Sequence, residues 1–346
     1  KASTYRIEET KAPEGFVKQG SEMALFDGKE MRLAEMVTGR GRYEENPTEV
    51  GEVAIASNTA HQIDPDTGAA IVEVDQSNDE QVGSLTLTKT GEQPAGITGG
   101  SILDQMKSVL TGIKDVITGT ESMGLHRGLK YEESGVEGAE FELHAKNTIY
   151  SPDGAKDEKG NPVVRYAKDD LVAKLTTGAD GKAVVNNLPL GSYYLKETKA
   201  GEHFVLNTEI KEITLTAEDD TQAVVYKGIS YKNERQKMKV TVNKKDAVSG
   251  ETLEGVIFGL YAGEDLVSGQ GKILIEKDTL LETKATDEEG KVTFDSDLYH
   301  GKYYVKEEQR LKGYLPNGDV WEFEAVYSDQ NVDMLTFEYE MENQPT

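Results

Sequence analysis

The sequence predicts an all-β protein built from tandem β-sandwich domains, with one amphipathic helix inserted at about 101–117. Two observations carry this prediction. A strand motif that ends in glutamate occurs three times, and the strands around it recur at spacings near a hundred residues, which is typical of tandem domains. The 35 glycines, with scattered Asp-Gly, Asn-Gly and Glu-Gly pairs, indicate the many turns of a β protein. We expect a first unit at 1–82 that lacks its opening strand, a second at 83–235 and a third at 236–346.

The glutamate motif reads as a strand in each unit and is followed by a loop with glycine and an aromatic residue. Its copies cover residues 5–11, 193–199 and 303–308. Because strand side chains alternate between faces, a tyrosine, an aliphatic residue and a glutamate share one face of each strand. An unpaired charge on a buried face is costly. Glu9, Glu197 and Glu307 are therefore expected to meet a polar partner in each core.

The opening and closing strands of the complete units carry polar residues on their apolar faces. Opening strands at 84–89 and 239–244 end in a lysine that shares a face with two aliphatic residues. Closing strands at 229–233 and 337–343 end in an asparagine on the face of an aromatic residue. The inward lysines and asparagines are Lys89, Lys244, Asn233 and Asn343, and Asn78 is the equivalent in the first unit, where no lysine partner is visible.

Each complete unit also contains an intervening strand and a tight turn. Residues 136–143 and 253–261 read as strands, and Asp-Gly or Glu-Gly turns follow within 177–184 and 286–293. The helix at 101–117 has apolar residues at helical spacing behind a possible Ser101 N-cap. It is inserted after Lys89, and it either packs across its own sandwich or contacts a neighbouring domain or partner.

A buried lysine, glutamate and asparagine can form a covalent bond. Burial lowers the pKa of a lysine and raises that of a glutamate, so both tend toward their neutral forms. A neutral amine is a nucleophile, and a glutamate can polarise the asparagine amide and move a proton to the departing nitrogen. The product is a Lys–Asn amide with loss of ammonia, which joins first to last strand. A lone Lys, Glu or Asn on a strand usually faces solvent, but the repetition in two matching units argues for partners.

These motifs resemble the CnaB-type (SpaA-like, prealbumin-like) domains of Gram-positive surface proteins and pilins. The resemblance rests on Thr-Leu-Thr-Lys89, Gly138-Ala139-Glu140-Phe141, Tyr-Tyr-Leu-Lys-Glu197-Thr-Lys and Tyr-Lys-Asn233, and covers nearly the whole chain. It implies immunoglobulin-like sandwiches with autocatalytic Lys–Asn isopeptide bonds, here Lys89–Asn233 and Lys244–Asn343, promoted by Glu197 and Glu307. No bond is predicted for Glu9 and Asn78. Alternatives stay open at Lys130, a rival to Lys89 because of the insertion, and at Lys245 and Glu308, which strand parity disfavours.

The resemblance implies stalk or spacer repeats of a cell-surface adhesin or pilus-like protein. Such a protein is extracellular, neighbours other domains of the same longer chain, and is wall-anchored through a segment outside this one. The alternative is an adhesive module that recognises a host protein or glycan through loops or the inserted helix. Single-turnover self-cross-linking apart, no enzyme activity is expected.

Composition excludes several other classes. A formal net charge of −25 argues against nucleic acid, and no apolar run is long enough to span a membrane. With no cysteine, disulfides and thiolate metal sites are excluded. No cofactor or metal is expected: the five histidines have no ligand-like spacing, Asp66-Thr67-Gly68 reads as a turn, and the acidic loop at 153–160 lacks EF-hand spacing and could hold calcium only weakly.

Overall fold

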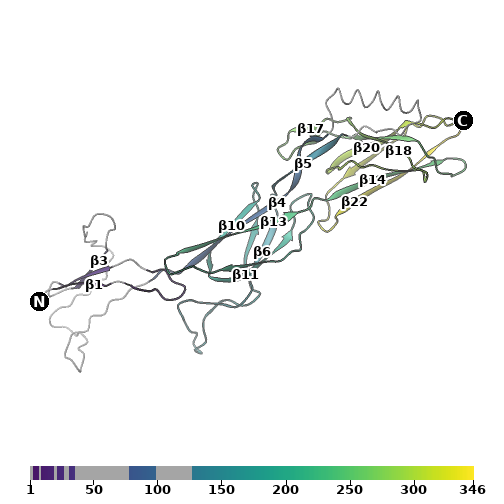
Figure 1. Ribbon diagram of the computed structural model, residues 1–346. Helices are drawn as coiled ribbons and strands as arrows, with labels where there is room; N and C mark the ends of the chain where they lie inside the picture. The colour runs from purple at the N-terminus through teal and green to yellow at the C-terminus, as the bar shows by residue number, and fades with distance from the viewer. Residues whose placement is uncertain (1–2, 8, 19–21, 27–30, 36–77, 99–126) are drawn as a thin grey trace.

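The computed structural model describes residues 3–7, 9–18, 22–26, 31–35, 78–98 and 127–346. Figure 1 shows an elongated molecule in which the strands form successive groups from the N-terminus to the C-terminus. Every regular element in the described ranges is a β-strand. The all-β prediction is confirmed, whereas the helix expected at 101–117 lies outside the described residues.

The second unit consists of two facing sheets. Its first sheet has the order β10-β4-β13, with β5 paired to the far half of β4, and its second sheet has the order β12-β11-β6-β9. A short β7–β8 hairpin lies beside them. The strands are β4 (Val82–Thr98), β5 (Gly128–Gly135), β6 (Glu140–Ala145), β7 (Ile149–Tyr150), β8 (Val164–Tyr166), β9 (Leu171–Thr176), β10 (Lys182–Pro189), β11 (Gly191–Lys199), β12 (Lys211–Leu215) and β13 (Val224–Asn233).

The third unit repeats this arrangement. One sheet has the order β19-β14-β22 and the other β18-β15-β20-β21, with a small β16–β17 hairpin. The strands are β14 (Lys237–Asp246), β15 (Ile257–Ala262), β16 (Leu266–Val267), β17 (Ile273–Ile275), β18 (Leu280–Ala285), β19 (Lys291–Thr293), β20 (Gly301–Gln309), β21 (Val320–Ala325) and β22 (Met334–Asn343).

The first and last strands of each complete unit lie side by side and run parallel. β4 pairs with β13 over Val82–Gly91, and β14 pairs with β22 along its whole length. Their inward residues alternate, so each unit has its own core between the two sheets. The opening and closing strands, far apart in sequence, therefore meet in the same sheet.

The first unit is described only in part. β1 (Ser3–Ile7), β2 (Glu22–Phe26) and β3 (Met31–Glu35) form an antiparallel sheet. Glu9 lies beyond the end of β1, whereas Glu197 and Glu307 lie within β11 and β20. The segment that follows β1 pairs with the segment that precedes β4 through an antiparallel β-bridge between Phe16 and Glu80.

The insertion in the second unit begins as an extension of its sheet. Beyond Lys89, β4 continues to Thr98 and pairs with β5, forming a β4–β5 arm that reaches the third unit. Leu129 of the arm is buried in the core of the third unit, and the Tyr131 hydroxyl donates to the Asp297 carbonyl over 2.9 Å. The guanidinium of Arg235 lies 3.7 Å from the centre of the Tyr131 ring. The arm thus contacts the neighbouring unit.

Candidate functional site

The parallel strand pair places a lysine and an asparagine together in each complete unit. Lys89 is in register with Tyr231, two residues before Asn233, and Lys244 is in register with Met341, two residues before Asn343. Residues two apart share a face, so each asparagine lies diagonally across from its lysine on the buried side of the sheet. The same offset occurs in both units.

In the second unit, Lys89, Asn233 and Glu197 form one buried cluster. The Lys89 amine donates a hydrogen bond to the Asn233 side-chain oxygen, and its Nζ lies 3.0 Å from Glu197 Oε1. Asn233 Nδ2 donates to the two Glu197 oxygens over 3.0 and 2.9 Å. Lys89 is 0% and Asn233 1% exposed. The glutamate comes from the opposite sheet, so the three groups meet between the sheets.

The third unit repeats the cluster with Lys244, Asn343 and Glu307. Lys244 Nζ lies 2.7 Å from Asn343 Oδ1 and 3.1 Å from Glu307 Oε2. Asn343 Nδ2 donates to the glutamate oxygens over 3.1 and 2.9 Å. The amine thus contacts the amide oxygen while the carboxylate binds the amide nitrogen, in the same arrangement as in the second unit.

Burial lowers the pKa of both lysines below the ordinary value. Desolvation is the largest cause for Lys89 and Lys244, and the adjacent glutamate opposes it in each case. Aromatic rings surround the amines: Lys89 Nζ lies 5.8 Å from the centre of the Phe141 ring and Lys244 Nζ 5.8 Å from that of Phe258. The apolar surroundings favour the uncharged, nucleophilic amine, whereas the carboxylate favours the ammonium.

Backbone and side-chain contacts that the sequence reading missed hold the clusters in place. The Asn207 backbone N–H donates to Glu197 Oε2 over 2.7 Å. Asn207 and Asn317 each lie ten residues after the cluster glutamate, and their side-chain amides donate to the carbonyls of Lys232 and Glu342, which directly precede the cluster asparagines. That shared spacing is the signal that could have revealed them.

The first unit keeps two members of the cluster. Asn78 Nδ2 donates to Glu9 Oε1 and Oε2, each over 2.9 Å, and to the Val17 carbonyl over 2.8 Å. The glutamate–asparagine contact therefore matches those of the complete units.

The rival residues lie elsewhere. Lys130 is exposed on β5 and pairs with Glu132 over 2.8 Å. Lys245 pairs with Glu340, and Glu308 accepts a hydrogen bond from the Tyr261 hydroxyl over 2.6 Å. All three stand apart from the clusters, as parity predicts for Lys245 and Glu308.

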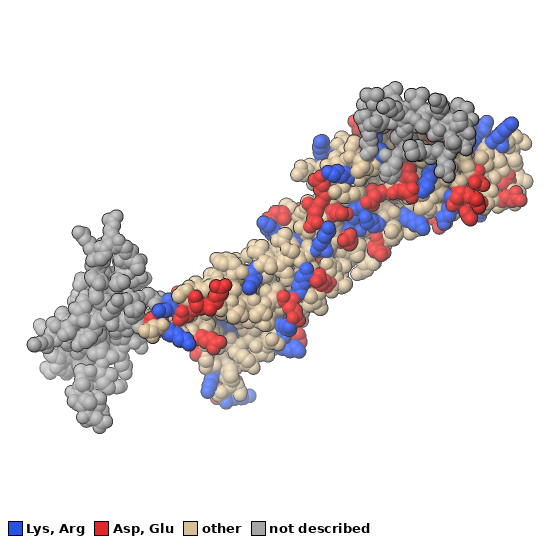
Figure 2. All heavy atoms as spheres, viewed as in Figure 1, with Lys and Arg blue, Asp and Glu red and all other residues tan. Residues whose placement is uncertain are grey.

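Among the described residues, no group of three His, Asp or Glu side chains is placed to hold a metal ion. In the acidic loop, Asp157 accepts backbone hydrogen bonds from Lys159 and Asn161 within its own turn. Asp66-Thr67-Gly68 lies outside the described residues. The described residues include no helix that is long and apolar enough to cross a membrane. On the face drawn in Figure 2, acidic and basic side chains are interspersed over the described residues without a continuous basic patch.

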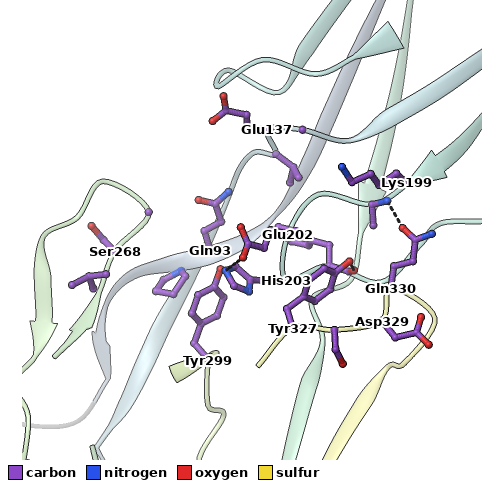
Figure 3. Close-up of a pocket in the computed structure, with 18 of the residues that line it drawn as sticks. Gln93, Glu137, Lys199, Glu202, His203, Ser268, Tyr299, Tyr327, Asp329 and Gln330 are labelled. Carbon is purple, nitrogen blue, oxygen red and sulfur yellow. Dashed lines mark hydrogen bonds and ion pairs between the residues drawn. The ribbon is translucent and has the colours of Figure 1, made fainter. Parts of the chain in front are cut away.

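Two histidines treated as isolated in the sequence lie together in the structure. His203 and His300 have ring centres 4.4 Å apart at the boundary between the second and third units. A hollow of about 1020 Å³ opens there, lined by both units and by Gln93 of the arm. Figure 3 shows His203, Tyr299 and Tyr327 converging on one wall of this hollow. It is separate from the two buried clusters.

Comparison with known proteins gives a family match and several similar folds. The model for the SpaA prealbumin-like fold domain matches residues 127–229 and 238–344. No curated protein matches. Among solved structures, the Bacillus anthracis TIE protein is 17% identical with a TM-score of 0.47, and the alignment covers all of this chain and 52% of that one. The chain thus spans about half of that structure.

Two pilin structures are also similar. A Streptococcal ancillary pilin is 14% identical with a TM-score of 0.26, over 95% of this chain and 82% of that one. The shaft pilin SpaA from Lactobacillus rhamnosus GG is 18% identical with a TM-score of 0.24, over 77% of this chain and 98% of that one.

Proposed function

Because the chain belongs to the SpaA prealbumin-like fold domain family, we propose that it is a stalk segment of a Gram-positive surface or pilus-like protein, stapled by Lys89–Asn233 and Lys244–Asn343 isopeptide bonds. One observation carries the proposal. In each complete unit a buried lysine amine contacts the asparagine amide oxygen, while a glutamate from the opposite sheet contacts both groups.

The geometry supports a simple bond exchange. The uncharged Lys89 amine attacks Asn233 Cγ, a new C–N bond forms to Nζ, and the bond from Cγ to Nδ2 breaks. Glu197 accepts a proton from Nζ and delivers one to Nδ2, which leaves as ammonia. Amine and primary amide become a secondary amide and ammonia, with no oxidant or reductant required. Lys244, Asn343 and Glu307 perform the same steps in the third unit.

The bonds would carry tension around the sandwiches. A pull that enters the second unit along β4 crosses from Lys89 to Asn233 and leaves at the end of β13. Residues 90–232 then lie outside the loaded path, as do residues 245–342 in the third unit. Unlike a disulfide, the link resists reduction, which suits a cysteine-free chain at a cell surface.

The bonds would also raise thermodynamic stability. The joined residues are separated by 144 and 99 positions. By the loop-entropy relation for disulfides, cross-links closing such loops stabilise by roughly 5 kcal/mol each. This is comparable to the whole stability of a small domain.

The proposed setting follows from the family. The chain would be extracellular, with neighbouring domains of the same longer protein as its partners and wall anchoring through another segment. Successive domains would have the boundaries 1–82, 83–235 and 236–346. Glu9 and Asn78 are the matching pair of the first unit, for which we propose no bond within this chain.

The test is the intact mass of the purified chain, followed by tryptic mapping. A deficit of two ammonia molecules, with peptides that join Lys89 to Asn233 and Lys244 to Asn343, is expected. Glu197→Ala and Glu307→Ala should each restore one ammonia mass, whereas Glu308→Ala, a neighbour outside the cluster, should not. A parent protein with the full sequence mass would refute the cross-linking proposal.

A further inference from the structure

The boundary between the first and second units is held by a compact set of hydrogen bonds to one loop, residues 219–223. Gln81 Nε2 donates to the carbonyls of Asp219 and Gln222 over 2.6 and 2.9 Å. The Ala12 N–H donates to Asp220 Oδ2 over 2.9 Å, and the Lys18 N–H donates to the Asp220 carbonyl over 2.6 Å. The Val82 N–H completes the set with the Ala223 carbonyl at 3.0 Å.

The boundary between the second and third units has the same set, on residues 329–333. Gln236 Nε2 donates to the carbonyls of Asp329 and Val332 over 3.2 and 2.7 Å. The Ala200 N–H donates to Gln330 Oε1, and the Leu206 N–H to the Gln330 carbonyl, both over 2.8 Å. The Lys237 N–H donates to the Asp333 carbonyl over 2.8 Å. Figure 3 shows Gln330 reaching across to the neighbouring unit.

The two sets match position by position. Each glutamine lies three residues after the inward asparagine, and each donating alanine lies three residues after the inward glutamate. Both glutamines are buried, Gln236 to 1% exposure. A buried side-chain amide without partners is costly, so a glutamine at this position depends on the loop to which it donates.

His300 also orients the amide of Gln236. Its Oε1 lies 2.8 Å from His300 Nε2. With the imidazole proton on Nε2, His300 donates to this oxygen, which leaves both amide hydrogens for the two loop carbonyls. All the hydrogen-bonding groups of the Gln236 side chain are then used.

The far end of the third unit has different residues at these positions. Thr346 is the position equivalent to Gln81 and Gln236. The backbone N–H of Thr346 donates to the Gly313 carbonyl, and the backbone N–H groups of Gln81 and Gln236 donate to the carbonyls of Gly15 and His203 in the same way. Pro316 is the position equivalent to Lys18 and Leu206, whose backbone N–H groups donate to the loop of the next unit. Proline has no N–H to donate. The third unit therefore lacks, at these two positions, the side-chain amide and the backbone N–H that the other two units supply.

We propose that these groups form an interdomain clamp, a docking site whose partner is the next domain of the same fold. Two backbone N–H groups of one unit, together with a glutamine in the segment that joins the two units, bind a five-residue loop of the next unit. The clamp holds successive domains in one relative orientation, so the chain is a rigid rod rather than a string of freely jointed beads. This inference does not depend on the isopeptide bonds.

Spin-label distance measurements on the full chain test the clamp. Because the chain has no cysteine, labels can be placed on Thr214→Cys and Glu324→Cys, two exposed strand positions in the second and third units. The parent should give one narrow distance distribution. Gln236→Ala should broaden it, whereas Gln344→Ala, an exposed glutamine outside the clamp, should not.

The partner side offers a second variant. Gln330→Ala removes the acceptor for Ala200 from a partly exposed loop, so it should broaden the distribution even if Gln236→Ala fails to fold. Narrow distributions in the folded variants, equal to that of the parent, would overturn the proposal. Intact mass on the same samples reports the cross-links separately, so loss of the clamp and absence of the bonds are distinguishable.

Discussion

Lys244 Nζ lies 2.7 Å from Asn343 Oδ1, although 99 residues separate the two. The contact closes the third unit from its first strand to its last, and it depends on the parallel pairing of β14 with β22. Lys89 and Asn233 stand in the same relation in the second unit. A lysine and an asparagine at the two ends of a domain are thus neighbours in its core.

Lys244→Met should destabilise the third unit strongly. It removes the partner of the buried Glu307 carboxylate, which costs about 3–5 kcal/mol, in addition to any cross-link. Trp321, the single tryptophan, lies in this unit and reports its unfolding in urea. Lys244→Met with Glu307→Gln should recover part of the loss, and Lys245→Met on the exposed neighbour should change little. A double variant no more stable than Lys244→Met would contradict this account.

The third unit should lose stability as the pH falls from about 6.5 toward 4. Burial, His203 and Arg235 lower the pKa of His300 to about 4, and burial also lowers that of His203. The unfolded chain therefore binds more protons in this window, so the stabilisation is complete above the ordinary histidine pKa and is lost as acid is added. The other rings that face the pair, Tyr299 and Tyr327, stay neutral there.

The urea midpoint from Trp321 fluorescence measures this effect. His300→Gln keeps a donor for Gln236 and does not titrate, so its midpoint should fall less than that of the parent between these pH values. Parallel losses in both proteins would show that His300 is not responsible.

The β4–β5 arm is part of the second unit in sequence, but it should stabilise the third unit. Leu129 is 7% exposed and lies in the core of the third unit. Leu129→Ala should therefore lower the free energy of unfolding seen by Trp321 by about 2–5 kcal/mol. Ile97, its 47% exposed partner in the β4–β5 ladder, provides the control, since Ile97→Ala on the surface should change it by no more than about 0.5 kcal/mol. Equal effects of the two substitutions would mean that the arm contributes nothing specific.

Local alternation was sufficient to predict the strands and the inward faces of Lys89 and Asn233, because the period of two does not depend on distant residues. The interdomain contacts were beyond that reasoning. The insertion separates β4 from β5, so the arm could not be read from adjacent strands, and His203 and His300 meet only when two units dock. Gln81 and Gln236 look like ordinary polar linker residues until the loops that they bind are known.

Replacing the turn glycine beside each inward lysine should cost more stability than its left-handed backbone conformation alone explains. Gly290 has φ +68°, and its carbonyl accepts the Lys244 N–H over 2.7 Å. A side chain there would place Cβ 2.6 Å from the Lys244 carbonyl oxygen. Gly271, with φ +77°, has no atom within 4 Å of such a Cβ. Both substitutions by alanine force a left-handed residue, at about 1–2 kcal/mol, but only Gly290→Ala also displaces the lysine strand.

We therefore expect Gly271→Ala to lose only the conformational cost, whereas Gly290→Ala loses more stability in urea and forms the Lys244–Asn343 bond more slowly. A time course of intact mass after synthesis separates the second effect from the first. If the two variants lose equal stability and cross-link at the parent rate, the turn does not position Lys244. The corresponding Gly181, with φ +73°, holds the Lys89 N–H in the same way, so Gly181→Ala should slow the bond of the second unit while leaving that of the third unchanged.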